Sequence, residues 1–448
     1  MPKVDRGPLR GRRFCAWARR PVRRHLCFGR RHRRRFPALT VVPKPGTLPT
    51  VQAESRVGTP SLALRGRGLR IAGILFLIGT EALLYGFSYP FFSLALEKQG
   101  LSNWLIGLNA SLAGVGILFF GPFLPRVIDR IGIGRLVALL FAIPFLSFAA
   151  ILLRGDTFTW FAARFIMGTC FSALWTTTEI WLNGELDDRR RGRIIAASGT
   201  LYAACQFVGP VLLGFSGAAG SLPLLVAMVP LAVGALVAAL LSDRGGPTPG
   251  LEEAEPAVSW RLAVVLAGPI LFTAFVSGVG ETAMQSLLPL YGLAHGLGDA
   301  AASGLVATFA LGEAVLVIAL GWSADRYGRR LVLVVATLVA ALSTAALPLA
   351  IGHVALLQAA LFLSGGTVAG VYTLGIVLIG QDFRGQRLAM VSTAFGMAYS
   401  AGSVIGATPI GYMIDLAGVE ALPIAVAGSF LMLALLIARP GRRDPDGS

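Results

Sequence analysis

Residues 321–330 read Gly-Trp-Ser-Ala-Asp-Arg-Tyr-Gly-Arg-Arg and lie between two apolar runs, at 302–322 and 331–351. Each run has the length of about 20 residues that an α-helix needs to cross the hydrocarbon core of a bilayer. The charged stretch between them leaves room only for a tight connection. It therefore predicts two membrane-spanning helices joined on one side of a bilayer.

Ten further apolar runs flank this pair, at 71–95, 104–124, 136–153, 157–182, 194–214, 221–241, 262–290, 355–380, 389–411 and 420–438. The whole chain is 55% hydrophobic and 14% charged. Soluble domains carry about 25% charged residues, so this composition excludes an ordinary soluble protein. The pattern predicts an all-α membrane protein with twelve transmembrane helices.

The basic residues alternate between the predicted loops. After residue 70, seventeen arginines fall in segments predicted to lie inside, whereas Lys98 and Arg154 are the basic residues of the outside loops. Basic residues are enriched on the cytoplasmic side of membrane proteins. We therefore expect a multi-pass protein of a bacterial-type inner (plasma) membrane, with both termini in the cytoplasm.

The positive charge of the chain is concentrated at its N-terminus. Residues 1–70 hold 19 Lys and Arg against two acids, and the rest of the chain is nearly neutral. Such a segment predicts a disordered cytoplasmic tail, and translation starting further along is an alternative. We expect a basic tail at 1–68 and a six-helix bundle at 69–241. A Gly-, Pro- and acid-rich cytoplasmic linker at 242–260 leads to a second six-helix bundle at 261–438 and a short cytoplasmic tail at 439–448.

The two halves resemble each other at a spacing just under 200 residues. The matches are Glu81 and Pro90 with Glu281 and Pro289, Asp129-Arg130-Ile131-Gly132 with Asp325-Arg326-Tyr327-Gly328, Arg191-Gly192 with Arg384-Gly385, and Gly209 with Gly402. Each match is weak by itself, but the four occur in the same order. Parallel six-helix repeats that hold a substrate between them near the midplane are a known transporter plan.

Several motifs resemble the major facilitator superfamily. Residues 321–330 match its loop motif Gly-x-x-x-Asp-Arg-x-Gly-Arg-Arg, and the first-half copy departs from it with Pro125 at the leading glycine and an insertion at Ile133-Gly134. Further resemblances are Arg164 with Gly168, Gly209-Pro210 with Gly214 for the antiporter motif, and, for the YcaD-like branch, residues 179–183 and 372–375. The resemblance implies a transporter built from two pseudo-symmetric six-helix bundles.

The loop motif also predicts a cytoplasmic gate. An aspartate in such a loop can accept hydrogen bonds from a helix N-terminus, and the neighbouring arginines can pair with acids across the cytoplasmic opening. The gate candidates are Asp129, Arg130, Glu179, Arg193, Gly321, Asp325, Arg326, Gly328 and Arg329. The alternative is that these arginines only set the topology.

Charged residues inside the predicted spans are candidates for the transport site, because such groups are costly in a bilayer. Glu81 and Arg164 reach similar depths, and the resemblance implies that their helices line the cavity. We expect Glu81 to exchange protons with Arg164 as its partner, and Glu281 to be a second site. The alternative is a buried structural pair. Glu313 has no predicted partner.

These features predict a secondary active transporter that is proton-coupled and works by alternating access, with export favoured over import. The weakly charged spans suggest a neutral, amphipathic or singly charged small molecule. No HExxH, GxSxG or GxxxxGK[ST] pattern occurs in the hydrophobic body, so we expect neither an enzyme nor a cofactor nor a metal. We expect a monomer in the lipid bilayer without a nucleic-acid partner; the alternative is a transporter-like receptor or assembly factor without flux.

Overall fold

A computed structural model describes residues 60–242 and 260–438, which make up the helical body. Residues 1–59, 243–259 and 439–448 lie outside the described part, and with them most of the predicted N-terminal tail, the predicted linker and the predicted C-terminal tail.

The described body is helical throughout and contains twelve helices of 17 residues or more. The first six are α1 (Pro60–Lys98), α2 (Asn103–Phe120), α4 (Ile133–Arg154), α5 (Thr157–Glu185), α6 (Asp188–Ser216) and α7 (Leu222–Ser242). The other six are α8 (Trp260–Ala294), α9 (Asp299–Tyr327), α10 (Arg329–Ala345), α12 (Val354–Asp382), α13 (Gly385–Ala417) and α14 (Ala421–Ala438). Three short helical segments are η1 (Gly121–Phe123), α3 (Leu124–Ile131) and α11 (Leu347–Ala350).

Within the described ranges, nine helices are long and apolar enough to cross a membrane by length and composition. Their outward faces carry large apolar side chains, and Phe215, Leu153 and Leu349 are each more than four-fifths exposed. Apolar patches of this kind are rare on soluble monomers. The all-α membrane fold predicted from the sequence is therefore confirmed.

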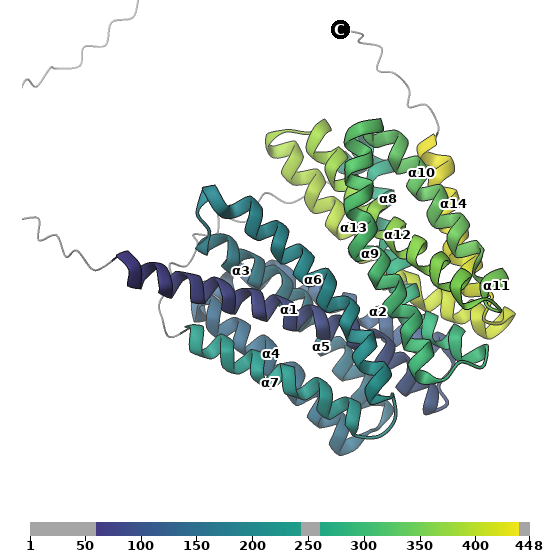
Figure 1. Cartoon of the computed structure of the whole chain (residues 1–448), viewed down its shortest axis with the longest axis horizontal. Helices are drawn as coiled ribbons and strands as arrows, with labels where there is room; N and C mark the ends of the chain where they lie inside the picture. Colours follow the sequence, from purple (N-terminus) through teal and green to yellow (C-terminus); the bar gives the residue numbers. More distant parts are fainter. Residues whose placement is uncertain (1–59, 243–259, 439–448) are drawn as a thin grey trace, which may run out of the picture. The chain divides into compact units, whose positions relative to one another are not determined.

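The helices form two bundles with the same internal arrangement. In Figure 1 helices α1 to α7 form one bundle and α8 to α14 the other. In the first bundle α1 packs on α6 and α4 packs on α7; in the second, α8 packs on α13 and α10 packs on α14. The bundles meet mainly where α2 contacts α13 and where α6 contacts α9.

The two copies of the loop motif share one hydrogen-bond pattern. The amide of Gly132 donates to Ile128 O at 2.9 Å, and the amide of Gly328 donates to Ala324 O at 3.1 Å. The carbonyl oxygen of each glycine in turn accepts a hydrogen bond of 3.1 Å from the amide four residues later in the chain. Both glycines have positive φ, 83° and 96°, which suits a residue without a Cβ. The connection predicted between the spans 302–322 and 331–351 is tight, as expected, and shorter than the break in hydrophobicity: helix α9 continues to Tyr327, and Gly328 alone separates it from α10.

The first-half copy is more broken than the second. Pro122 lies in η1 and Pro125 lies in the first turn of the separate helix α3, whereas α9 runs unbroken through the equivalent stretch. Proline lacks the amide hydrogen that a helix interior needs, but it is tolerated in a first turn. The prolines therefore account for the extra helix in the first half.

Repeat-related glycines let helices approach closely in both bundles. A Cβ on Gly209 of α6 would lie 2.4 Å from Leu83 O of α1, and a Cβ on Gly402 of α13 would lie 2.0 Å from Phe275 O of α8. Both distances are too short for any side chain. These glycines therefore set the contact of α1 with α6 and of α8 with α13.

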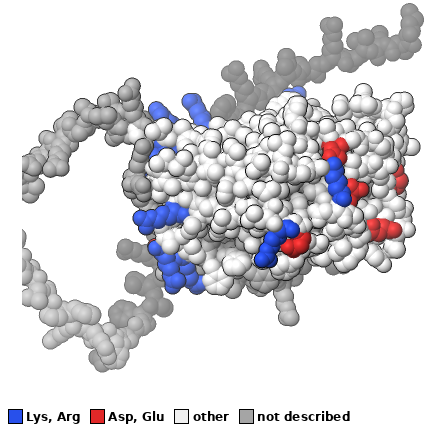
Figure 2. Space-filling view, turned by 90° about the horizontal axis from the view of Figure 1, so that it is seen from below, with Lys and Arg blue, Asp and Glu red and all other residues white. Residues whose placement is uncertain are grey.

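The two ends of the body differ in charge. We call the end with the α2–α4 and α9–α10 connections the basic end, and the end with the α1–α2, α8–α9 and α13–α14 connections the acidic end. Most Lys and Arg on the face drawn in Figure 2 lie toward one end of the body, and most Asp and Glu lie toward the other. Asp299, Asp415 and Glu420 all belong to the acidic end.

The short α4–α5 connection at the acidic end is a capped helix start. Asp156 accepts from Thr159 N at 2.8 Å and from Thr159 Oγ1 at 2.9 Å, so it is the N-cap of α5. These two hydrogen bonds hold the pKa of the exposed Asp156 below its usual value. The predicted break between the spans 136–153 and 157–182 is very short, and this cap marks where α4 ends and α5 begins.

The halves are joined by polar contacts at the acidic end. Asp415 at the end of α13 accepts from the amides of Asn103 and Trp104 at 3.0 and 2.9 Å, so it caps the N-terminus of α2 in the other bundle. Lys98 of α1 forms an ion pair with Asp299 of α9. These contacts hold the bundles together at this end.

The first helix begins earlier than predicted. Helix α1 begins at Pro60, before the first predicted span at 71–95, and Arg67 and Arg70 within it contact Glu185 at the end of α5. Arg70 pairs with Glu185 at 2.5 Å, and Arg67 pairs with Asp187 at 2.8 Å. Arg67, which lies in the predicted tail segment, and Arg70 therefore anchor α1 at the basic end.

We expect Arg70→Met to destabilise the body. Glu185 is 8% exposed, so removal of its cation leaves a nearly buried carboxylate without a partner. Such losses cost 3–5 kcal/mol for fully buried pairs, and partial solvation of Arg70 reduces the expected loss to about 2–3 kcal/mol. Chemical unfolding in detergent measures it. Arg67→Met, in a more exposed pair, is the control, and an equal loss in both variants would contradict this account.

Candidate functional site

A cavity of about 560 Å³ lies between the two bundles. Its walls come from α1, α5 and α6 of the first half and from α8, α12 and α13 of the second. Two carboxylates and several aromatic side chains line it: Glu81, Tyr85, Phe171, Trp175, Tyr202, Glu281, Tyr372 and Tyr399. A pocket of this size between the halves can hold a small molecule.

Glu281 of α8 is held by two neutral groups. The Tyr399 hydroxyl of α13 donates to Glu281 Oε2 at 2.7 Å, and Gln285 Nε2 donates to Oε1 at 3.2 Å. The Tyr399 ring packs edge-on against Tyr372 of α12, with 4.9 Å between ring centroids. The structure thus places the predicted second carboxylate at the wall of the cavity.

Glu81 of α1 has the equivalent arrangement in the first half. Its Oε1 accepts from the Tyr202 hydroxyl of α6 at 3.5 Å, and Tyr202 packs edge-on against Trp175 of α5 at 4.5 Å. The sequence reasoning missed Tyr202 and Tyr399. The signal was present, because these tyrosines are 197 residues apart, as are Trp175 and Tyr372, which is close to the period of the repeat.

Glu313, which had no predicted partner, bridges the halves. Gln206 of α6 donates from Nε2 to Glu313 Oε2 of α9 at 3.1 Å, where the two bundles meet. The other carboxylate oxygen, Oε1, is buried without a hydrogen-bond partner. Glu313 therefore belongs to the interface, and its position there could not be inferred from its own half of the sequence.

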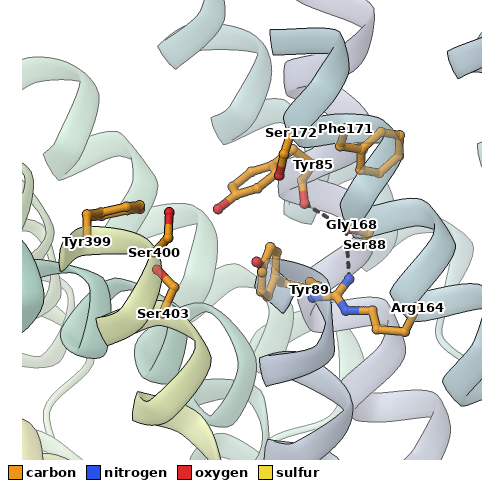
Figure 3. A pocket seen from close by; sticks show the side chains of 12 residues that line it. Tyr85, Ser88, Tyr89, Arg164, Gly168, Phe171, Ser172, Tyr399, Ser400 and Ser403 are labelled. Atoms are coloured by element: carbon orange, nitrogen blue, oxygen red, sulfur yellow. Dashed lines mark hydrogen bonds between the residues drawn. The ribbon is translucent and has the colours of Figure 1, made fainter. Parts of the chain in front are cut away.

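Arg164 of α5 lies in a smaller pocket of about 80 Å³ next to the cavity. Its side chain is 2% exposed, and Nη1 donates to Ser88 Oγ at 3.2 Å. The guanidinium lies 4.0 Å from the ring centroid of Tyr89 and 5.1 Å from that of Phe92. Its Nε and Nη2 have no partner. Figure 3 shows the guanidinium beside Tyr89, with Ser400 and Ser403 on the opposite side of the pocket.

The predicted pairing of Glu81 with Arg164 is wrong. Glu81 contacts Tyr202, whereas Arg164 contacts Ser88, seven residues further along α1. Seven residues correspond to about 10 Å of helix, too far for an ion pair. The depths estimated from the sequence were similar, but the bounds of α1 and α5 place the two side chains in different layers of the bundle.

The predicted gate residues lie at the basic end, and the contacts described there for the second-half motif are local. Asp325 pairs with Arg329 of the next helix at 3.4 Å across Gly328, and Arg326 lies 5.7 Å from the rings of Trp322 and Tyr327. Gly321, Asp325 and Arg329 line a small pocket between α9, α10 and α12. Asp129, Arg130, Glu179 and Arg193 are exposed, and their part in a gate stays a prediction.

A search for clusters of three or more His, Cys, Asp or Glu side chains that could hold a metal finds none within the described residues. The chemistry of the site is therefore that of carboxylates, tyrosine hydroxyls and one guanidinium.

Comparisons with known proteins give one family. The family model described as Major Facilitator Superfamily matches residues 74–306 and 270–448. The chain is 25% identical over 382 residues to YfkF of Bacillus subtilis, described as an uncharacterized MFS-type transporter, covering 83% of this chain and 96% of that one. It is 27% identical over 356 residues to an uncharacterized MFS-type transporter of Yersinia pestis, covering 78% and 90%.

The fold is also similar to solved structures. A crystal structure of the nucleoside transporter NupG superimposes with a TM-score of 0.65 at 14% identity, covering 82% of this chain and 98% of that chain. A second structure of the same transporter gives 0.68 at 13% identity. At this identity the likeness shows the fold alone.

We expect Tyr399→Phe to lower the stability of the cavity wall. The change removes the hydroxyl that donates to Glu281 and keeps the ring against Tyr372. A hydrogen bond of this kind contributes about 1 kcal/mol, so the free energy of unfolding in detergent should fall by about that amount.

Tyr412→Phe on the same helix is the matched control, because Tyr412 is 55% exposed. Tyr202→Phe should cost less than Tyr399→Phe, since its hydrogen bond is longer. Equal stability of Tyr399→Phe and the wild type would show that the hydroxyl does not hold Glu281.

Proposed function

Because the chain belongs to the major facilitator superfamily, we propose that this multi-pass membrane transporter moves a small molecule by proton-coupled alternating access between its two halves. The observation that carries the proposal is the cavity between the halves, lined by repeat-related carboxylates on α1 and α8. A site built from both halves is exposed to either side of the membrane when the halves rock about it.

The contacts between the halves support an inward-facing state. Asp415, Lys98 and Asp299 join the bundles at the acidic end. We propose that the basic end faces the cytoplasm of a bacterial-type inner membrane, because arginines are enriched there. The cavity then opens toward the cytoplasm, where Trp175 and Thr176 of its wall are exposed. Transport requires the acidic end to open in its turn.

Proton coupling is proposed for Glu81 and Glu281. Each contacts a tyrosine hydroxyl, and the described residues place no Lys, Arg or His within ion-pair distance of either carboxylate. A charge buried without a counter-charge is costly, so a carboxylate in this position exchanges a proton or is hydrated. A substrate that displaces water from the cavity changes that balance, which couples the proton to transport.

Finer properties extend the proposal. We propose export as the direction, on the resemblance of Gly209-Pro210 with Gly214 to an antiporter motif, and membership of the YcaD-like branch on residues 179–183 and 372–375. We further propose a working monomer without a nucleic-acid partner, organised as two bundles at 69–241 and 261–438 joined by a linker. A receptor or assembly factor without flux is the alternative.

Glu281→Gln and Glu81→Gln should each weaken the pH dependence of ligand binding, and the double variant should abolish it. Amide side chains keep the size of the carboxylates and cannot exchange protons at neutral pH. The purified full chain is heated in detergent with a metabolite and drug library at pH 6 and pH 8. A ligand at a hundred times its Kd stabilises the folded state by about 2.7 kcal/mol.

Glu97→Gln is the control, because Glu97 is exposed at the end of α1. A hit whose pH dependence is unchanged in the double variant would contradict proton exchange at these carboxylates. Uptake of the hit into proteoliposomes separates transport from the receptor alternative, since a receptor binds without flux.

Asp415→Ala should favour opening of the acidic end. The change removes the cap that joins α13 to α2 and leaves the amides of Asn103 and Trp104 unpaired. Loss of a cap costs about 0.5–2 kcal/mol, which shifts the conformational equilibrium by roughly twofold to thirtyfold. The readout is labelling of Ser403→Cys by a membrane-impermeant maleimide added outside intact cells.

Labelling should be faster with Asp415→Ala than without it. Asp156→Ala, which removes a cap within one bundle, is the matched control and should leave the rate unchanged. An unchanged rate in Asp415→Ala would show that this cap does not hold the acidic end closed.

A further inference from the structure

We propose that Arg164 binds the carboxylate of the transported molecule, which is a small monocarboxylate with an apolar or aromatic body. The inference rests on the proposed function, because it names the substrate class of the same cavity. It starts from the charge of Arg164 and from the pocket beside it.

Arg164 is a buried cation to which the described part of the chain gives no counter-ion. Its side chain is 2% exposed, and its one hydrogen bond goes to the neutral hydroxyl of Ser88. Nε and Nη2 carry donors that meet no acceptor. A guanidinium stays charged inside proteins, so proton loss does not relieve this. The arrangement leaves both a positive charge and hydrogen-bond donors available to a ligand.

The aromatic rings around Arg164 do not compensate for its burial. Tyr89 at 4.0 Å and Phe92 at 5.1 Å offer cation–π contacts. Such contacts are worth about 2 kcal/mol when desolvated, whereas burying an ion costs several kcal/mol even after relaxation. The rings orient the guanidinium but do not neutralise it.

The carboxylates of the described helices do not serve as its counter-ion either. Glu81 contacts Tyr202, Glu281 contacts Tyr399 and Gln285, and Glu313 contacts Gln206. Across the described residues, no acid lies within ion-pair distance of Arg164. The cation and the carboxylates are thus kept in separate parts of the site, and the anion that completes Arg164 must come from outside.

The pocket at Arg164 has the size and lining of a carboxylate subsite. It holds about 80 Å³ and is lined by the hydroxyls of Ser88, Ser172, Ser400 and Ser403, without an acidic residue. Figure 3 shows Ser400 and Ser403 of α13 across the pocket from Tyr89 and Arg164. The hydroxyls of Ser88 and Ser400 already donate to Tyr85 O and Gly396 O, which leaves those of Ser172 and Ser403 as donors to a ligand. A guanidinium with such hydroxyls is a set that binds a carboxylate, and the planar fork of arginine matches its two oxygens.

The same pocket shows where the rest of the ligand lies. It shares Tyr85, Phe171, Ser172, Tyr399 and Ser400 with the cavity of about 560 Å³. A ligand with its carboxylate at Arg164 therefore extends its body among the aromatic side chains of that cavity. One cation in the lining matches one negative charge, so a monocarboxylate fits better than a phosphate dianion.

The test compares each acid with its own amide. The full chain, purified in detergent, is heated with propionate, lactate, benzoate, phenylacetate and indole-3-acetate, and with the corresponding primary amides; Kd of each hit follows by titration. We expect at least one acid to bind and its amide to bind about tenfold more weakly or not at all, the discrimination of one charge-assisted contact.

Variants at Arg164 assign that preference to this side chain. Arg164→Gln should weaken binding of the acid about tenfold or more and leave binding of the amide unchanged. Arg164→Lys keeps the charge without the planar fork and should retain part of the preference. Arg154→Gln, at an exposed arginine that ends α4, is the control and should bind as the wild type does. If Arg164→Gln does not fold, the ratio of the Kd of the amide to the Kd of the acid is compared between the wild type and Arg164→Lys. A smaller ratio in Arg164→Lys supports the inference, and an equal ratio contradicts it.

Three outcomes overturn the inference. These are equal binding of acids and amides, an acid preference that persists in Arg164→Gln, and binding of none of the acids. A neutral or cationic ligand whose uptake is indifferent to Arg164 would overturn the carboxylate site and leave the transporter standing. An acid that binds through Arg164 but does not enter proteoliposomes would support the carboxylate site and contradict the transport function.

Discussion

Hydrocarbon offers no hydrogen bonds, and every polar group within the bilayer must therefore find its partner inside the protein. The backbone meets this constraint by forming helices, and the side chains meet it by pairing between helices. Glu81 with Tyr202 and Glu281 with Tyr399 are such pairs, and each joins the first helix of a bundle to its fifth. The same helices approach closely at Gly209 and Gly402. Polar pairing and close packing thus bring the carboxylates to the cavity wall.

The repeat organises the site as well as the fold. Two copies of one arrangement, Glu–Tyr with an aromatic ring against the tyrosine, face the cavity from opposite halves. The departures from symmetry are equally informative. Arg164 has no counterpart of the same charge in the described second half, and Glu313 pairs across the interface rather than within its bundle. The described site is therefore symmetric in its carboxylates and asymmetric in its cation.

The polar contacts at the two ends of the molecule differ in which helices they join. At the acidic end, the Asp415 carboxylate of one bundle caps helix α2 of the other, so that exposed hydrogen bonds join the bundles there. At the basic end, ion pairs such as Arg70 with Glu185 join helices of the same bundle. These contacts at the basic end thus lie within a bundle, whereas those at the acidic end join the two bundles.

The sequence by itself determined the membrane fold, the repeat and the two carboxylates of the cavity, because apolar run length, basic loops and charges within spans are local signals. It placed the helices to within a few residues, apart from the start of α1, where arginines in a helical turn resemble those of a tail. Only the tertiary structure decided the partners. Glu81 meets Tyr202 instead of Arg164, because side-chain contacts depend on the rotation and shift of packed helices. Depth along one helix does not contain that information.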